Sequence, residues 1–146
     1  MAVKWGIFST GNIAGKFADE FPYVDNASLE AVASRTQEKA EDFAGQYNIP
    51  KAYGSYQELA EDPNIDIVYI STPHNAHYEN IKLCFEYHKH VMCEKPMTVN
   101  ALQMEEIIKL ARDKNLFLME AMWTYFLPPI MQAKAWVDEG KIGELQ

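Results

Sequence analysis

The feature that most constrains the fold is a regular alternation of short apolar runs with longer segments of helical periodicity. Apolar runs typical of buried strands occupy residues 3–9, 29–34, 65–71, 90–93 and 116–119. Helices are expected at 12–21, at 36–47, in a short stretch from 55, after the turn at 72–74 through 84, and at 100–115. Helices between strands of one sheet form right-handed crossovers. The sequence therefore predicts an α/β fold with a doubly wound parallel sheet.

Capping residues support two of these helix boundaries. Thr36 is expected to cap the second helix, which Asn48-Ile49-Pro50 ends, because the residue before a proline avoids helical backbone angles. Ser55 and Glu58 have the spacing of a capping box and predict the start of the short third helix.

Composition narrows the class of protein and of partner. The 146 residues, 48% of them hydrophobic, suffice for one core, and the formal net charge of -8 argues against a nucleic-acid partner. We therefore expect small-molecule ligands. Neither an apolar run of about 18 residues nor a signal peptide is present, so no membrane association and a cytoplasmic location are expected. Cys84 and Cys93 are then expected to be reduced, buried thiols.

The turn after the first strand suits a dinucleotide phosphate group. Gly11 stands where a bare backbone lets pyrophosphate approach, and Ala14 where the following helix packs on the sheet. The amino end of that helix offers amides and partial positive charge to the phosphates. Ser9 replaces the first glycine of the fingerprint, so the turn taken alone is also compatible with an ordinary glycine turn.

The end of the second strand indicates which cofactor binds. NAD sites usually place a carboxylate there, whereas this chain has Ser34 and Arg35, with Lys39 one turn later. A hydroxyl, a guanidinium and an ammonium favour the 2'-phosphate of NADP, although NAD remains possible. The alternative is that Arg35 is a solvated surface charge.

The strand at 90–93 leads into Glu94-Lys95-Pro96 at the edge where open parallel sheets bind ligands. An amine beside an oxidised nicotinamide and away from water can exchange a proton near neutral pH, so Lys95 is the candidate catalytic residue. A lysine after a strand is otherwise a surface residue. His74 and His77 lack further ligands at a suitable spacing, so no metal site is expected.

The end of the sequence is expected to lead into a second domain. Pro128 and Pro129 predict the start of a helix that ends near Gly140, and a further strand is expected from Gly143 onward. We expect the chain to be a piece of a longer protein, with residues 1–122 as the nucleotide-binding domain. Residues 123–146 are then a connecting helix and the start of the second domain.

Several separated blocks together resemble the glucose-fructose oxidoreductase, inositol dehydrogenase and MocA (Gfo/Idh/MocA) family. These blocks are Lys4-Trp5-Gly6-Ile7, Glu94-Lys95-Pro96 and Gly143-Glu144-Leu145. The blocks at 49–56, 93–96 and 118–124 resemble its dihydrodiol dehydrogenase branch, whose members also oxidise D-xylose with NADP. Tyr125 stands where that branch usually has an arginine, which leaves the substrate open.

The resemblance implies a Rossmann domain followed by an α+β domain that shapes the substrate pocket and forms a homo-oligomer. It implies NADP-dependent hydride transfer at the CH–OH group of a sugar or cyclic diol, with Lys95 catalytic and with Arg35 and Lys39 at the 2'-phosphate. His77 and Trp123 match positions that line the nicotinamide end, and Pro96 matches a proline that commonly follows a cis peptide. Since the family has further catalytic residues in the second domain, the 146-residue chain is expected to be inactive alone.

The residues expected to contact the cofactor come from the turns at the strand ends and from the resemblance. They are Ser9, Thr10, Gly11, Asn12, Ile13, Ser34, Arg35, Lys39, Ser71, Thr72, His74, His77, Glu94, Lys95 and Trp123. The alternative function is a non-catalytic module of the same family that binds or senses NADP(H).

Overall fold

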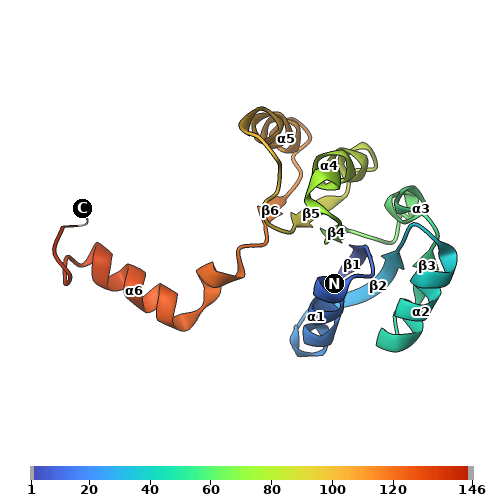
Figure 1. Cartoon of the computed structure of the whole chain (residues 1–146), viewed down its shortest axis with the longest axis horizontal. Coiled ribbons are helices and arrows are strands. Elements are labelled where there is room, and N and C mark those ends of the chain that lie inside the picture. Colours follow the sequence, from blue (N-terminus) through green and yellow to red (C-terminus); the bar gives the residue numbers. More distant parts are fainter. Residues whose placement is uncertain (1, 145–146) are drawn as a thin grey trace.

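The computed structural model describes residues 2–144 and contains a six-stranded sheet with helices on both faces (Figure 1). The strands are β1 (Val3–Phe8), β2 (Ala27–Ala33), β3 (Lys51–Tyr53), β4 (Ile67–Ile70), β5 (His90–Cys93) and β6 (Leu118–Glu120). The α-helices are α1 (Asn12–Glu20), α2 (Gln37–Tyr47), α3 (Tyr56–Glu61), α4 (His77–Glu86), α5 (Ala101–Asp113) and α6 (Pro128–Asp138). Short 3-10 helices are η1 (Phe21–Tyr23), η2 (His74–Ala76) and η3 (Trp123–Phe126).

The predicted doubly wound parallel sheet is confirmed. Every strand pair is parallel, and the strand order is β3-β2-β1-β4-β5-β6. The chain winds outward in one direction from β1 to β3 and in the other from β4 to β6. The order therefore reverses between β1 and β4, which is where open sheets of this kind form a ligand crevice at the strand carboxyl ends.

Two apolar layers hold the sheet, one on each face. In β1, Ile7 packs in the layer that contains residues of α1 and α2, while its neighbour Phe8 packs in the layer formed with α3, α4 and α5. All four residues of β4 are buried, as expected for a central strand covered on both faces. Burial on both faces fixes the positions of the strand ends that carry the candidate site.

The helix starts expected at Thr36 and Ser55 are both present, but only Ser55 forms a capping hydrogen bond. Ser55 Oγ accepts from the Glu58 amide at 3.2 Å and Glu58 Oε2 accepts from the Ser55 amide at 3.0 Å, so the predicted capping box is present. Thr36 is the N-cap of α2, but its side chain forms no capping hydrogen bond. The expected helix start is therefore confirmed, although no hydrogen bond from the side chain supports it.

One strand was missing from the sequence prediction. The edge strand β3 has three residues, all only partly buried, and pairs with the end of β2. Such a short segment has no periodicity that could distinguish it from a loop. At the other end of the chain, Gly143 and Glu144 lie in no strand, and the remainder of the strand expected there falls outside the described residues.

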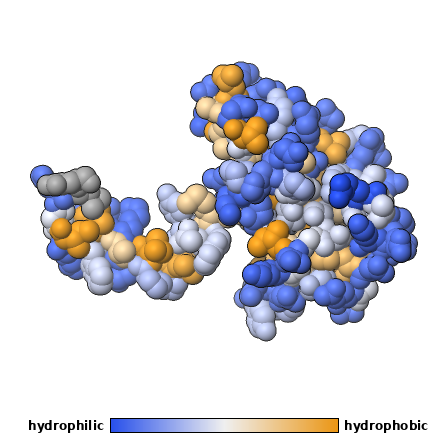
Figure 2. All heavy atoms as spheres, in the orientation of Figure 1, coloured by the Kyte–Doolittle hydropathy of each residue, from blue (hydrophilic) through white to orange (hydrophobic). Residues whose placement is uncertain are grey.

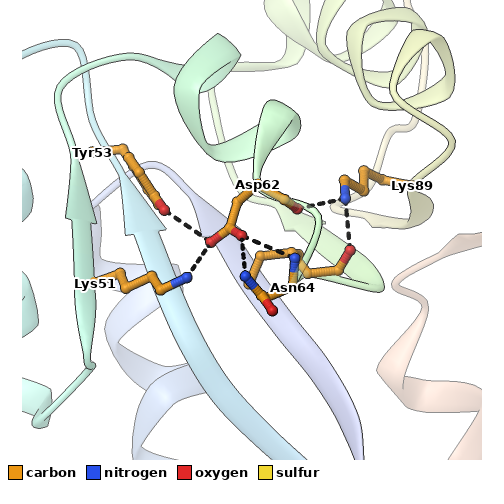
Figure 3. A network of polar contacts seen from close by, with 6 residues as sticks. Lys51, Tyr53, Asp62, Asn64 and Lys89 are labelled. Carbon is orange, nitrogen blue, oxygen red and sulfur yellow. Dashed lines mark hydrogen bonds and ion pairs between the residues drawn. The ribbon is translucent and has the colours of Figure 1, made fainter.

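A polar network joins the segments that lead into β4 and β5, at the edge of the sheet opposite the strand carboxyl ends (Figure 3). Asp62 Oδ2 accepts from Lys51 Nζ at 2.6 Å and from the Tyr53 hydroxyl at 2.8 Å. Buried Lys89 donates to the carbonyl oxygens of Asp62 and Ile65 at 2.6 and 2.8 Å. Burial lowers the pKa of Lys89 from its ordinary value.

Helix α6 extends away from the sheet, and its main packing contacts among the described elements are with η3 (Figure 1). Its apolar side chains, including Ile130, Met131 and Trp136, are exposed, and Figure 2 shows orange patches along this segment.

Cys84 and Cys93 are free and buried. Within residues 2–144, no helix has the length and apolarity needed to span a membrane.

Candidate nucleotide-binding and catalytic site

The turn between β1 and α1 has the geometry that a dinucleotide fingerprint requires. Ser9 adopts a φ of 94°, in the region that favours glycine, so it fills the place of the first fingerprint glycine. Its backbone amide donates to the Ala33 carbonyl at 2.9 Å, and its hydroxyl accepts from the Gly11 amide at 3.3 Å. The first bond attaches the turn to the end of β2, and the second lies within the turn.

Two glycines beside this turn have different environments. A Cβ at Gly11 would meet only Ser9 Oγ, at 3.7 Å, so packing within the protein does not demand a glycine there. An approaching ligand would use that open surface. A Cβ at Gly15 would lie 2.5 Å from the Tyr47 hydroxyl, so a larger residue there would force the Tyr47 side chain to shift where α1 meets α2. Fully buried Ala14 packs in the same apolar layer, as expected for the fingerprint.

The turns after β1, β2 and β4 surround a groove of about 810 Å³. Seven of the residues expected at the cofactor line it, namely Ser9, Thr10, Gly11, Ser34, Arg35, Lys39 and Thr72. Arg35 and Lys39 are exposed at one end. None of the residues lining the groove is acidic, so its charged side chains are two cations and no anion. Sequence reasoning had missed Thr36, Tyr56, Pro73, Asn75 and Ala76.

The two hydroxyl residues after β4, Ser71 and Thr72, form hydrogen bonds within the protein. Buried Ser71 donates its hydroxyl to the Phe8 carbonyl at 3.0 Å and does not line the groove. The Thr72 hydroxyl accepts from Asn80 Nδ2 at 2.9 Å. These bonds hold the β4–α4 turn against β1 and α4. Thr72 therefore lines the groove on a turn that is held in place, whereas Ser71 is buried behind it and helps to hold that turn.

The two histidines of this turn lie in different environments. His74 is exposed and does not line the groove, while His77 is fully buried. The ring of His77 lies between two carbonyl oxygens, with Nε2 2.8 Å from that of Thr72 and Nδ1 2.9 Å from that of Pro96. His77 thus lies beneath the ligand edge instead of along it. No cluster of metal-ligating side chains occurs among residues 2–144.

The segment after β5 is held from both neighbouring strands. The peptide between Lys95 and Pro96 is cis, as the resemblance implied. The Tyr69 hydroxyl donates to Glu94 Oε1 at 2.6 Å, and the Met97 amide donates to Glu120 Oε1 at 2.8 Å. Burial, followed by the bond to Glu94, raises the pKa of Tyr69 well above its ordinary value. Glu120 is a site residue that the sequence prediction did not contain.

Two further hollows lie beside the segment that follows β5. Lys95 is exposed, has no ion pair with any described residue, and lines a cavity of about 330 Å³ with Glu120, Trp123 and Thr124. Trp123 also borders a hollow of about 570 Å³ together with Ile13 and Glu94. Asn12 lies next to Ile13 in the first turn of α1. The predicted residues therefore gather along one edge, with Lys95 at the far end from Arg35.

Two of the residues that sequence reasoning missed, Tyr56 and Glu120, lie close to strand ends that it did not place. Tyr56 follows β3, which was not predicted, and its ring stacks on Phe8 with centroids 4.8 Å apart. Glu120 ends a strand that was expected to stop at Met119. The carboxylate at a strand carboxyl end was the signal that could have identified Glu120.

Comparison with known proteins agrees with this arrangement. A family model described as "Oxidoreductase family, NAD-binding Rossmann fold" matches residues 3–122. Trans-1,2-dihydrobenzene-1,2-diol dehydrogenase of Xenopus tropicalis is 44% identical over 149 residues, and that of Mus musculus is 44% identical over 148. In both cases all of this chain aligns, with 45% and 44% of the relative. The chain thus spans less than half the length of these relatives.

Solved structures resemble the fold along nearly the whole chain. An NAD binding oxidoreductase from Klebsiella pneumoniae superimposes with a TM-score of 0.90 at 32% identity, covering 98% of this chain and 40% of that one. A 3-ketoreductase from Actinomadura kijaniata, in complex with TDP-benzene and NADP, gives a TM-score of 0.90 at 29% identity. The superposition covers 99% of this chain and 46% of the 3-ketoreductase chain.

Proposed function

The chain belongs to the Gfo/Idh/MocA oxidoreductases and contributes an NAD(P)-binding Rossmann domain, and on that basis we propose that it binds NADP for a dehydrogenase acting on a sugar or cyclic diol. The observation that carries the choice of cofactor is the charge of the groove. Arg35 and Lys39 line it after β2, and no lining residue is acidic. A 2'-phosphate gains charge-assisted hydrogen bonds in such a groove, whereas the ribose of NAD lacks its usual carboxylate.

The residues of the groove fit the parts of this cofactor in order. The glycine-rich turn and the amino end of α1 suit the pyrophosphate, because a Cβ is absent at Gly11 and the first amides of the helix have no partner within it. Arg35 and Lys39 suit the 2'-phosphate at one end. Lys95, Glu94 and Trp123 lie along the same sheet edge and would accommodate the nicotinamide end.

The mechanism assigns proton handling to Lys95. NADP, when bound, supplies the acceptor for the hydride that leaves the substrate carbon. The neutral amine of Lys95 accepts a hydrogen bond from the reacting hydroxyl and takes up its proton, becoming an ammonium, as the C–O bond gains double-bond character. Tyr69 and Glu120 form hydrogen bonds to the peptide segment on either side of Lys95. The Lys95 side chain therefore extends from a backbone that is fixed on both sides.

The remaining length of the relatives suggests what else the activity needs. We propose that residues 123–146 lead into a second domain that completes the substrate site and forms a homo-oligomer, because the chain spans 45% of a relative that acts on a diol. The exposed apolar side chains of η3 and α6 support this, since patches of that kind usually pack against another surface.

Cofactor choice is tested by titrating the 146-residue chain with NADPH and NADH while following tryptophan fluorescence. We expect tighter binding of NADPH, and we expect Arg35→Asp to weaken it by about 10-fold or more while NADH binding changes little. Arg112→Asp makes the same charge change on the exposed end of α5 and should leave both affinities unchanged. Equal affinities in the unchanged protein would contradict NADP as the preferred cofactor.

Catalysis is tested in the full natural protein with D-xylose and trans-1,2-dihydrobenzene-1,2-diol. Lys95→Met should retain NADPH binding and lose turnover by at least about 100-fold, because general acid–base catalysis typically contributes that much. A variant that binds NADPH and turns over at the unchanged rate would remove the mechanism. Binding without turnover in the unchanged protein would favour a sensing module.

A further inference from the structure

Glu120 and Lys95 border the same small cavity, although they come from different strand ends. In the parallel register of β5 and β6, Glu120 lies beside Cys93, two residues before Lys95. Two residues after Lys95, the Met97 amide donates to Glu120 Oε1 at 2.8 Å. The turn that carries Lys95 therefore contacts Glu120 at both of its ends. This arrangement places the Glu120 carboxylate close to the backbone of the segment that carries Lys95.

Glu120 retains hydrogen-bonding capacity after its bond to Met97. A carboxylate has about four acceptor positions. Within residues 2–144, the Met97 amide is its one hydrogen-bond partner and no cation pairs with it. The side chain is partly exposed and lines the cavity of about 330 Å³. One carboxylate oxygen therefore fixes the turn while the other can accept a hydrogen bond from a ligand.

The other walls of this cavity define what kind of ligand would fit. Trp123 offers an apolar ring that is 65% exposed, and Thr124 adds a hydroxyl. The volume lies at the lower end of small-molecule sites, which begin at about 300 Å³. An amine and a carboxylate from neighbouring strand ends, facing an aromatic ring, suit a small cyclic compound with hydroxyl groups on adjacent carbons.

We propose that Glu120 is a specificity-determining residue that accepts a hydrogen bond from the hydroxyl adjacent to the one that is oxidised. This inference rests on the proposed function, because it takes Lys95 as the partner of the reacting oxygen. Lys95 then holds the reacting hydroxyl and Glu120 holds its neighbour. A substrate with a single hydroxyl would leave the carboxylate of Glu120 without this hydrogen-bond partner.

The test compares trans-cyclohexane-1,2-diol with cyclohexanol as substrates of the full natural protein. Glu120→Gln keeps an amide oxygen for the Met97 amide and removes the charge, so the turn is preserved. We expect kcat/KM for the diol to fall by about 10-fold or more, since a hydrogen bond to a charged group is lost. We expect the value for cyclohexanol to change by less than about twofold. Glu105→Gln, on exposed α5, is the matched control and should change neither.

Three results would overturn the inference, and they are distinguishable. An equal loss for both substrates would show that Glu120 acts only on the turn, and an unchanged diol rate would show that it does not contact the substrate. Oxidation of neither substrate by the unchanged protein, with D-xylose and the dihydrodiol also inert, would remove the proposed function and this inference with it. Glu120→Asp serves if Glu120→Gln unfolds: it keeps the charge on a shorter side chain, and the same selective loss for the diol is expected.

Discussion

The Tyr69 hydroxyl donates to Glu94 Oε1 at 2.6 Å, so a side chain of β4 holds the residue that precedes Lys95. The phenol is itself fixed, because its ring stacks on Phe17 of α1 with centroids 4.0 Å apart. The apolar layer between α1 and the sheet thus positions a polar group at the ligand edge. Packing between α1 and the sheet therefore helps to fix the position of Glu94, the residue before Lys95.

Replacing Tyr69 with phenylalanine should lower stability without changing the packing of the ring. The substitution removes the donor from a partly buried carboxylate, which typically costs about 1–3 kcal/mol. Urea unfolding of the 146-residue chain measures this loss. Tyr23→Phe is the matched control, because Tyr23 is 84% exposed and should lose almost nothing. Equal unfolding midpoints for the two variants would contradict a stabilising bond between Tyr69 and Glu94.

Replacing Asp62 with asparagine should destabilise the edge of the sheet opposite the cofactor. The carboxylate accepts from Lys51, Tyr53 and both the backbone and the side chain of Asn64, and a neutral amide cannot satisfy all of these donors. We expect a loss of about 1.5–3 kcal/mol, as for hydrogen bonds to charged groups. Asp42→Asn, on the exposed face of α2, is the control measured under the same conditions.

The contribution of Asp62 should also depend on pH. Burial disfavours its charge, but hydrogen bonds from Lys51, Asn64 and Tyr53 outweigh burial and hold its pKa well below the ordinary value. The unfolded chain therefore binds a proton first as the pH falls. The contribution is fully present above about pH 4, the ordinary range of an aspartate, and is lost as the pH falls toward the lower pKa of the folded state.

Unfolding free energies of the unchanged chain and of Asp62→Asn, measured at a series of pH values, test this sign. The difference between the two should be constant near neutral pH and should shrink on acidification below about pH 4. A difference that grows on acidification would mean that the native state raises the pKa of Asp62.

Individual elements and residues show which parts of the fold and of the candidate site the sequence alone predicts. The buried run of β4 and the helical face of α5 have strong periodic signals, and both elements were predicted. His77 was expected along the nicotinamide end, yet its ring lies buried between the carbonyls of Thr72 and Pro96. Sequence spacing places a residue on a turn, but it does not show that the turn after β5 brings the Pro96 carbonyl to within 2.9 Å of the ring.

The contact between α1 and α2 gives a last prediction, which compares two helical glycines. At Gly45 a Cβ would meet nothing within 4 Å, so Gly45→Ala should stabilise the chain by about 0.5–1 kcal/mol through helix propensity. At Gly15 a Cβ would lie 2.5 Å from the Tyr47 hydroxyl and 3.3 Å from its Cζ, so Gly15→Ala forces that side chain to move. Such overpacking typically costs about 1–3 kcal/mol, which outweighs the gain in helix propensity.

Thermal unfolding of the two single variants and of Gly15→Ala combined with Tyr47→Phe separates these effects. Removing the hydroxyl eliminates the closest contact, so the double variant should recover part of the stability that Gly15→Ala loses. The recovery is partial because the ring carbon remains close. If Gly15→Ala stabilises the chain as much as Gly45→Ala, then the approach of Tyr47 does not require a glycine, and α1 has room for a side chain directly behind the phosphate-binding turn.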